Sequence, residues 1–363
     1  MAGNTILIAG ASGIVGRAAV ARFNALPGWK VIALSRRAPD LEGPHAHLAL
    51  DLSDASACEA ASARFADVTH VVFAALYELP GLVAGWRETA QMETNLAFLS
   101  NLMTPLLRVA KDLRHVTLLQ GTKAYGAHIA PMKVPARERW PRHQHANFYW
   151  LQEDWLRAAQ KGRDWSFSIL RPQIIFGHGL GSPMNMLAAI GAYGALSKAR
   201  GEPLHWPGGP PYVASGTCAN LLARAIEWVG TSPAAANETF NITNGDVYVW
   251  RNLWPAIARA LGMEEGEPRP MKLSDEMPKR QAEWAALVQR HGLRPWTLQQ
   301  FVGDSFVYAD WQFAYGRERP GPPVIVSSVK SMQAGFHHVV DTEDMLADWF
   351  EEFRRLKLLP PLS

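Results

Sequence analysis

The chain has few cysteines, no strong bias of charge and no long apolar run. Its two cysteines, Cys58 and Cys218, are too few for a disulfide framework and suit a reducing compartment. The formal net charge is only +3, with neither a basic block nor an acidic tail, so we expect no nucleic-acid partner. No stretch approaches the ~18–20 apolar residues of a membrane helix, and we expect neither membrane association nor a secretory leader. These absences predict a cytoplasmic protein.

Motifs for metal binding and for several enzyme classes are also missing. The histidine pairs His45–His47, His143–His145 and His337–His338 lack carboxylates or cysteines at a recognisable metal spacing, so we predict no metal. Neither a Gly-x-Ser-x-Gly nucleophile motif nor a P-loop occurs. Apolar residues, in contrast, make up 48% of the 363 positions, which is enough for a large core.

A glycine-rich turn near the start of the chain organises the prediction. Residues 6–9 are an apolar run of the length of a strand buried on both faces, and residues 18–23 read as an apolar helix. Between them Gly10, Gly13 and Gly16 have the spacing that makes a tight turn, admits a pyrophosphate and lets the helix pack on the sheet. The alternation of strands and helices continues beyond this turn. The sequence therefore predicts an α/β fold with a Rossmann-type doubly wound parallel sheet that binds a dinucleotide.

The second predicted strand, residues 30–34, ends in Ser35, Arg36 and Arg37. NAD-binding proteins tend to place a carboxylate here, about 20 residues after the glycines, to hold the ribose 2′-hydroxyl. Guanidinium groups pair instead with a phosphate. We therefore predict NADPH/NADP+ as the cofactor. The alternative is that the two arginines are only a solvated surface pair.

Further predicted strands at 47–50, 68–75, 114–119 and 166–170 bring more residues to the same edge of the sheet. Ligands of open α/β sheets lie at the carboxyl ends of the strands, so these ends predict one site. Asp51 follows the first of these strands, where its carboxylate is expected to reach the adenine amino group.

The glycine spacing, the Arg171-Pro172 pair and the order of the elements resemble the extended short-chain dehydrogenase/reductase superfamily. Its members usually carry Tyr-x-x-x-Lys on one helix, but here Tyr149 is followed four residues later by Glu153. A lysine lies upstream instead, in the Gly-Thr-Lys-Ala-Tyr stretch 121–125, and the tyrosine lies in Asn-Phe-Tyr at 147–149.

This rearrangement is similar to the progesterone 5β-reductase/iridoid synthase-like (PRISE) enone reductases. Residues 35–37 and 240–246 also look like motifs of that group, and the similarity runs from Gly10 to about Leu356. The resemblance implies hydride transfer from NADPH to the β-carbon of an α,β-unsaturated carbonyl. Matched by position, Tyr149 is its catalytic tyrosine and Lys123 its catalytic lysine.

The two residues make chemical sense together. A phenol donor beside an ammonium would stabilise the negative charge that grows on the carbonyl oxygen as the enolate forms. The alternatives are a packed core tyrosine and a surface lysine. At the level of function, the alternatives are a ketone or aldehyde reductase and a non-catalytic NADP-sensing protein. The strand ends and the resemblance together predict these cofactor contacts: Gly10, Ser12, Gly13, Ile14, Val15, Gly16, Ser35, Arg36, Arg37, Asp51, Leu52, Ala74, Ala75, Gln120, Gly121, Thr122, Lys123, Tyr149, Pro172, Ile174 and Ile175.

The C-terminal half offers fewer signals. We place the NADP-binding domain at 1–178 and a smaller, mostly helical substrate region at 179–363, with segments around 210–245 returning to the Rossmann core. The last stretch is expected to form helices that close over the site, and the residues that suggest this are Trp296, Trp311, Phe313 and Trp349.

The expected substrate is a small apolar enone, whose identity the sequence leaves open, as it does the oligomeric state, a homodimer included. The predicted substrate contacts are Tyr125, Phe148, Trp150 and Met184. We interpret Tyr125 as a packing residue of the site wall. Glu153 and Asp154 are interpreted as carboxylates that complement the dipole at the start of a helix.

Overall fold

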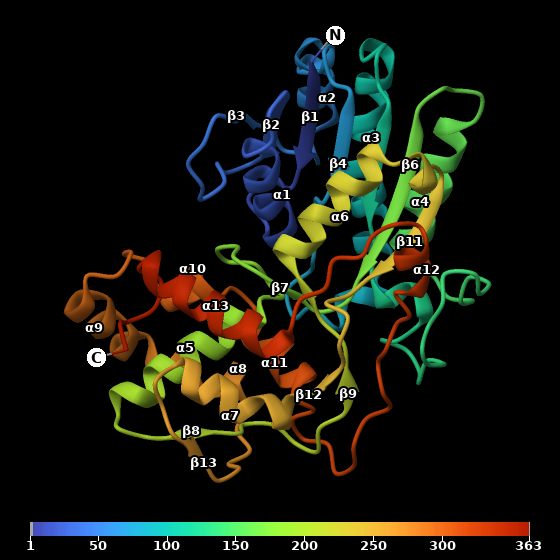
Figure 1. Cartoon of the computed structure of the whole chain (residues 1–363). Helices are drawn as coiled ribbons and strands as arrows, with labels where there is room; N and C mark the ends of the chain where they lie inside the picture. The colour runs from blue at the N-terminus through green and yellow to red at the C-terminus, as the bar shows by residue number, and fades with distance from the viewer. Residues whose placement is uncertain (1–2, 363) are drawn as a thin grey trace.

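A parallel sheet forms the centre of the N-terminal part of the molecule (Figure 1). The computed structural model describes residues 3–362. Within them the sheet has seven strands in the order β11-β6-β5-β4-β1-β2-β3, and each neighbouring pair is parallel. This order confirms the predicted Rossmann-type doubly wound sheet. Its strands are β1 Asn4–Ala9, β2 Trp29–Ser35, β3 Ala46–Ala49, β4 His70–Phe73, β5 His115–Leu119, β6 Ser166–Pro172 and β11 Glu238–Ile242.

Apolar side chains alternate between the two faces of the sheet because successive strand residues point in opposite directions. In β1, Ile6 and Ile8 belong to the core that contains helices α1 and α6, whereas Leu7 and Ala9 belong to the core that contains α2, α3 and α4. Both faces are therefore covered, as a parallel sheet requires. These helices are α1 Ile14–Asn24, α2 Ala55–Ala60, α3 Thr89–Val109, α4 Phe148–Gln160 and α6 Ala219–Thr231.

Two predicted elements are shorter than expected. The strand expected to reach Ala75 ends at Phe73, because the chain then crosses the glycine-rich turn. A Cβ atom at Gly10 would lie 2.7 Å from the backbone of Ala74, which shows how closely the two segments pass. The spacing of apolar residues from Ser274 to His291 also predicts one helix, but α8 ends at Glu276 and α9 begins at Gln281, since Pro278 lacks the amide that a continuous helix would use.

Residues after 179 form a second group of helices, drawn below the sheet in Figure 1. Helix α5 is buried along most of its length and packs against α9, α10, α11 and α13. Strand β11 and helix α6 return to the sheet, where β11 pairs with β6 and α6 packs on α1. The domain boundary at residue 178 stays a prediction. The helices of this part are α5 Met186–Ala199, α7 Trp250–Ala260, α8 Leu273–Glu276, α9 Gln281–His291, α10 Leu298–Val302, α11 Ser305–Gln312 and α13 Thr342–Arg355. Helix α12 Val329–Gln333 lies instead beside β11 of the sheet (Figure 1).

Three small strand pairs lie in this second part: β7 Ile175–Phe176 with β10 Thr217–Cys218, β8 Leu204–His205 with β13 Glu265–Gly266, and β9 Val213–Ala214 with β12 Tyr248–Val249. Among residues 3–362, no helix combines the length and the apolar character needed to cross a membrane.

Candidate active site

A cavity of about 530 Å³ runs along the carboxyl ends of the central strands. Its lining includes every residue predicted to contact the cofactor except Gly16. The strand ends thus meet where the topology predicts, although cofactor contact itself remains a prediction. The described chain contains no group of three or more metal-ligating side chains that could hold an ion.

The glycine-rich turn has the geometry of an anion cradle. Gly10 has a φ of 81°, a left-handed conformation that favours glycine. A Cβ at Gly16 would lie 2.1 Å from the carbonyl oxygen of Gly10, so this glycine serves packing and does not line the cavity. The N-cap of α1 is Gly13, which has no side chain to bind the amides of the first helical turn. The first-turn amides of α1 are therefore free to bind a phosphate group, as at other helix N-termini.

Positive charge lies at the end of β2. Arg36 and Arg37 are exposed, line the cavity and take part in no ion pair with the described residues. Ser35 Oγ donates to the carbonyl oxygen of Arg37 at 2.6 Å and so shapes this turn. Asp51 also lines the cavity, and hydrogen bonds from the backbone and hydroxyl of Ser53 lower the pKa of its carboxyl. The turn therefore offers two unpaired guanidinium groups to an anionic ligand.

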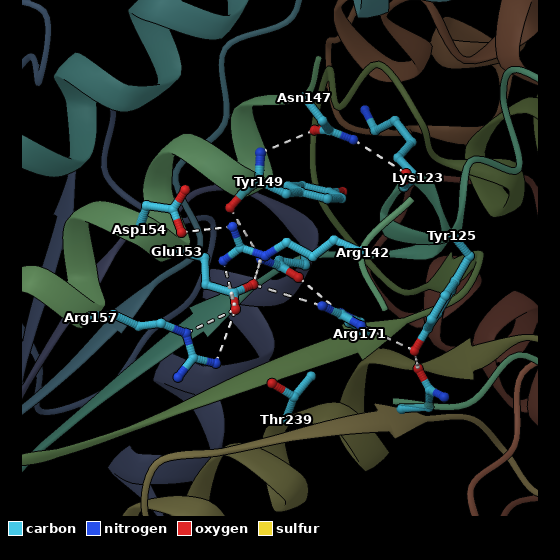
Figure 2. Close-up of polar contacts among 12 residues, drawn as sticks. Lys123, Tyr125, Arg142, Asn147, Tyr149, Glu153, Asp154, Arg157, Arg171 and Thr239 are labelled. Carbon is cyan, nitrogen blue, oxygen red and sulfur yellow. Dashed lines mark hydrogen bonds and ion pairs between the residues drawn. The ribbon is translucent and has the colours of Figure 1, made fainter. Parts of the chain in front are cut away.

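Asn147 brings the two predicted catalytic residues together. It is the N-cap of α4: its Oδ1 accepts from the amide of Tyr149 at 3.0 Å, while its Nδ2 donates to the carbonyl oxygen of Lys123 at 3.3 Å. One side chain thus joins α4 to the short helical turn η3 (Thr122–Tyr125) that carries the lysine. Lys123 Nζ lies 5.8 Å from the centroid of the Tyr149 ring (Figure 2).

The hydroxyl of Tyr149 faces the cavity. A Cβ at Gly121 would lie 3.3 Å from it, and the structure records no hydrogen bond from it to any residue between 3 and 362. Burial, together with the charge of Glu78, raises the pKa of Tyr149 well above its ordinary value. The phenol is therefore a neutral, proton-bearing donor directed at whatever occupies the cavity.

Lys123 is buried beside a carboxylate. Its Nζ lies 3.4 Å from Glu78 Oε1, and it stands 4.5 Å above the centroid of the Trp86 ring. Burial lowers the pKa of Lys123, and the charge of Glu78 opposes this effect. This environment excludes the alternative that Lys123 is a surface lysine.

The predicted substrate wall requires correction. Met184 lines the cavity, but Tyr125, Phe148 and Trp150 do not. Successive residues of a helix point about 100° apart, so Tyr149 lines the cavity while Phe148 and Trp150 do not, although the centroid of the Phe148 ring lies 5.4 Å from Lys123 Nζ. The hydroxyl of Tyr125 donates to Asn241 Oδ1 at 2.7 Å, away from the cavity. The wall is formed instead by Tyr77, Glu78, Trp86, His128, Tyr212, Tyr308, Trp311 and Gln312, among others.

The comparisons with known proteins agree with this geometry. Residues 51–360 match the PRISE-like Rossmann-fold domain family. The chain belongs to this family. It is 30% identical to an (S)-8-oxocitronellyl enol synthase of Camptotheca acuminata, over 98% of this chain and 93% of that protein. It is also 30% identical to a 3-oxo-Delta(4,5)-steroid 5-beta-reductase of Arabidopsis thaliana, over 98% and 92% of the two chains. The resemblance seen in the sequence is confirmed.

Two solved structures illustrate the similarity of the fold. A UDP-glucose 4-epimerase of Thermotoga maritima, with UDP-glucose, has a TM-score of 0.67 at 18% identity, covering 97% of this chain and 99% of that one. A short-chain dehydrogenase/reductase superfamily protein of Agrobacterium tumefaciens with bound NAD has a TM-score of 0.64 at 17% identity, with 98% of each chain covered. At these identities the likeness shows the fold alone.

The interpretation of Glu153 and Asp154 as helix-start carboxylates is wrong in this PRISE-like chain. The first turn of α4 holds no acidic residue, since the helix begins at Phe148. Figure 2 shows three arginines turned toward Glu153: Arg142 and Arg157 pair with it at 3.0 and 2.9 Å, and Arg171 lies at 3.7 Å. Burial raises its pKa, but the bonds and charges of these neighbours offset this, and the pKa lies below its usual value.

Glu153 therefore joins separate elements, whereas Asp154 pairs with Arg142 near the surface. Gln120, at the end of β5, also donates to Glu153 at 3.2 Å. Glu153, the fourth residue after Tyr149, is thus a buried anchor between α4, the sheet and loop 129–146.

Glu78 and most of the aromatic residues that line the cavity were not predicted from the sequence. Glu78 lies in an irregular segment after β4, where no periodicity indicates which side chains point inward. The tryptophans of the last stretch were a partial signal: Trp311 lines the cavity, whereas Trp296, Phe313 and Trp349 do not.

Proposed function

We propose that the chain is an NADPH-dependent reductase of α,β-unsaturated carbonyl compounds that adds hydride to the β-carbon. One observation carries this proposal: the neutral phenol of Tyr149, which has no hydrogen-bond partner among residues 3–362, and the ammonium of Lys123 face one cavity beside the glycine-rich turn. The relatives named as an enol synthase and as a steroid 5-beta-reductase support the same chemistry.

The residues of the cavity fit NADPH. The free amides of α1 suit the pyrophosphate, and Arg36 with Arg37 suits the 2′-phosphate. The walls toward the other end, near Gln120 and Ile174, lie next to Tyr149 and suit the nicotinamide. NADPH, when bound, supplies the hydride.

Tyr149 and Lys123 act on the carbonyl oxygen of the substrate. The Tyr149 hydroxyl donates a hydrogen bond to this oxygen and keeps its own proton in the resting enzyme, because its pKa is raised by burial. The Lys123 ammonium adds a positive field in a site shielded from water, where such fields act strongly. Negative charge that develops on the oxygen during hydride arrival is thereby stabilised, and the enolate is the product of the step.

Two attributes complete the proposal. The aromatic wall and Met184 favour a small apolar enone as substrate. We expect a cytoplasmic location, which the two free cysteines, Cys58 and Cys218, support, and a homodimer stays a prediction.

The test is NADPH oxidation with a panel of enones, saturated ketones and aldehydes, with the products identified. Saturated ketones from enones, with activity reduced in Tyr149→Phe and Lys123→Met, would support the proposal. Tyr125→Phe is the matched control, since it removes a buried hydroxyl that faces away from the cavity. Turnover of unconjugated carbonyls alone would establish the ketone or aldehyde reductase instead. Tight NADPH binding without turnover of any of them would favour an NADP sensor.

A further inference from the structure

Lys123 is held by the segment between β4 and α3, residues 76–88, which includes the short helical turn η2 (Gly85–Arg87). This segment contributes both Glu78 and Trp86 to the surroundings of the ammonium. The side chains of Glu78 and Lys123 are 4% and 13% exposed, so the pair lies inside the molecule. A buried ion pair persists only where geometry and further hydrogen bonds compensate for lost hydration. The surroundings of Glu78 supply both.

The Glu78 carboxylate is fully engaged. Its Oε2 accepts from Trp86 Nε1 at 3.1 Å and from Gln91 Nε2 at 2.7 Å, which leaves Oε1 for Lys123. The donors come from three places: the segment itself, helix α3 and the turn η3. Because each oxygen has its donors, the carboxylate is fixed before any ligand enters.

The backbone on both sides of Glu78 is also fixed. Asn95, one turn after Gln91 on α3, accepts from the amide of Tyr77 at 2.9 Å and donates to its carbonyl oxygen at 2.9 Å. Gln91 Oε1 accepts from the amide of Leu79 at 2.9 Å. Asn95 and Gln91 are 0% and 1% exposed, so these bonds are shielded from water. Helix α3 thus clamps the chain around Glu78.

We propose that Glu78 is a positioning residue, which fixes the ammonium of Lys123 in the cavity and keeps it charged beside Tyr149. This inference rests on the function proposed above. Without the carboxylate, burial would favour the neutral amine, which cannot supply a positive field. Trp86 contributes the aromatic face on which the ammonium rests.

The other titratable groups near the pair do not take over this role. Tyr149 on α4 and Tyr308 on α11 have pKa values raised by burial and remain neutral. Burial, with the charge of Lys123, lowers the pKa of His128 to about 3, so it is neutral as well. Besides Lys123, the charged or titratable groups that act on His128 are Arg87, His143 and His145.

The experiment compares Glu78→Gln with Glu93→Gln, which makes the same charge change at an exposed site on α3. We expect kcat for an enone at pH 8 to fall at least about tenfold in Glu78→Gln, with the alkaline limb of the kcat profile about one pH unit lower. Glu93→Gln is expected to behave as wild type. An unchanged pH profile in Glu78→Gln would overturn the inference.

A second readout does not depend on turnover. Reductive methylation, in which formaldehyde forms an imine with a neutral amine and added cyanoborohydride reduces this imine, labels neutral amines, and peptide mass spectrometry reports its extent at Lys123. Faster labelling of Lys123 in Glu78→Gln than in wild type at pH 8 supports the inference even if no enone is reduced, an outcome that would refute only the proposed function. Equal labelling in both proteins overturns it.

A double variant covers the case in which Glu78→Gln is poorly folded. Glu78→Gln added to Lys123→Met should leave kcat as low as Lys123→Met alone and raise its melting temperature, because a lone buried carboxylate is removed. A further loss of kcat in the double variant would show that Glu78 does not act through Lys123.

Discussion

The cavity has two walls that are built in different ways. One wall consists of the carboxyl ends of parallel strands and the glycine-rich turn, and its residues follow one another by sheet register. The other wall comes from segment 76–88, the loop at His128 and helix α11, which lie far apart in sequence. Predicted residues of the first wall lie almost without exception where the sequence places them. Of the predicted substrate contacts, only Met184 does.

The difference shows what local sequence patterns encode. A strand that is buried on both faces fixes where its end lies, because every parallel strand ends at the same edge of the sheet. No comparable rule places Glu78 or Tyr308, whose positions depend on contacts with elements distant in the chain. The chemistry proposed for Lys123 therefore depends on both walls. Lys123 itself follows a strand of the predictable wall, whereas its partner Glu78 comes from the other wall.

The largest loss of stability is expected on replacing Glu153, which joins separate elements behind the cavity. Replacement by Gln keeps the shape but leaves Arg171, only 8% exposed, without its carboxylate. We expect the free energy of unfolding at pH 7 to fall by about 3 kcal/mol, measured by urea titration. Asp154→Asn, at a side chain 62% exposed, should change it by less than about 1 kcal/mol. Equal effects of the two substitutions would contradict the anchoring role.

The stability difference between wild type and Glu153→Gln should depend on pH. The folded pKa of Glu153 lies below the ordinary value, so its contribution is complete above the unfolded pKa of about 4.3. It is lost as the pH falls through the folded pKa. The difference in unfolding free energy between wild type and Glu153→Gln should therefore be constant from pH 5 to 7 and shrink under acid conditions. A difference that grows on acidification would contradict this sign.

Two glycines test the predictable wall itself. A methyl group at Gly16 would lie 2.1 Å from the backbone of Gly10, whereas at Gly13 the nearest atom is 3.4 Å away. Gly16→Ala should therefore reduce stability by about 2 kcal/mol. Gly13→Ala should leave stability nearly unchanged and weaken NADPH binding about tenfold or more, because its methyl group enters the cradle. Calorimetry and NADPH titration separate the two; similar melting temperatures for both variants would argue against the packing role of Gly16.

The positions of the sheet, the glycine-rich turn, Tyr149 and Lys123 could thus be predicted from the sequence. Most of the side chains that surround Tyr149 and Lys123 could not. The resemblance located both residues, and Asn147 explains physically why they meet. Glu153 was misinterpreted because the start of α4 by itself does not reveal that three arginines from other elements converge on it. Long-range ion pairs of this kind leave no local spacing to detect.

The arginines at the end of β2 sharpen the comparison for the cofactor. We expect Arg36→Ala combined with Arg37→Ala to weaken NADPH binding about 10–100-fold, since the guanidinium–phosphate bonds of these two exposed arginines together contribute about 1.5–3 kcal/mol. NADH binding should change less than about threefold, as measured by fluorescence titration. Arg64→Ala, exposed and outside the cavity lining, is the control. An equal loss for NADH would mean that the two arginines do not distinguish the cofactors.

The smallest effect is expected at Tyr125, where sequence and structure disagree about the wall. Its hydroxyl bonds to Asn241 and accepts from Arg171 at 3.3 Å, so Tyr125→Phe should cost about 1 kcal/mol of stability and leave KM for the enone unchanged. Met184→Ala, which enlarges the cavity, should raise KM several-fold with little loss of stability, because Met184 is only half-buried. Steady-state kinetics with one enone decides between them. A raised KM in Tyr125→Phe would show that Tyr125 contacts the substrate after all. It would also support the original expectation that residues next to Tyr149 and Lys123 in the sequence lie next to the substrate.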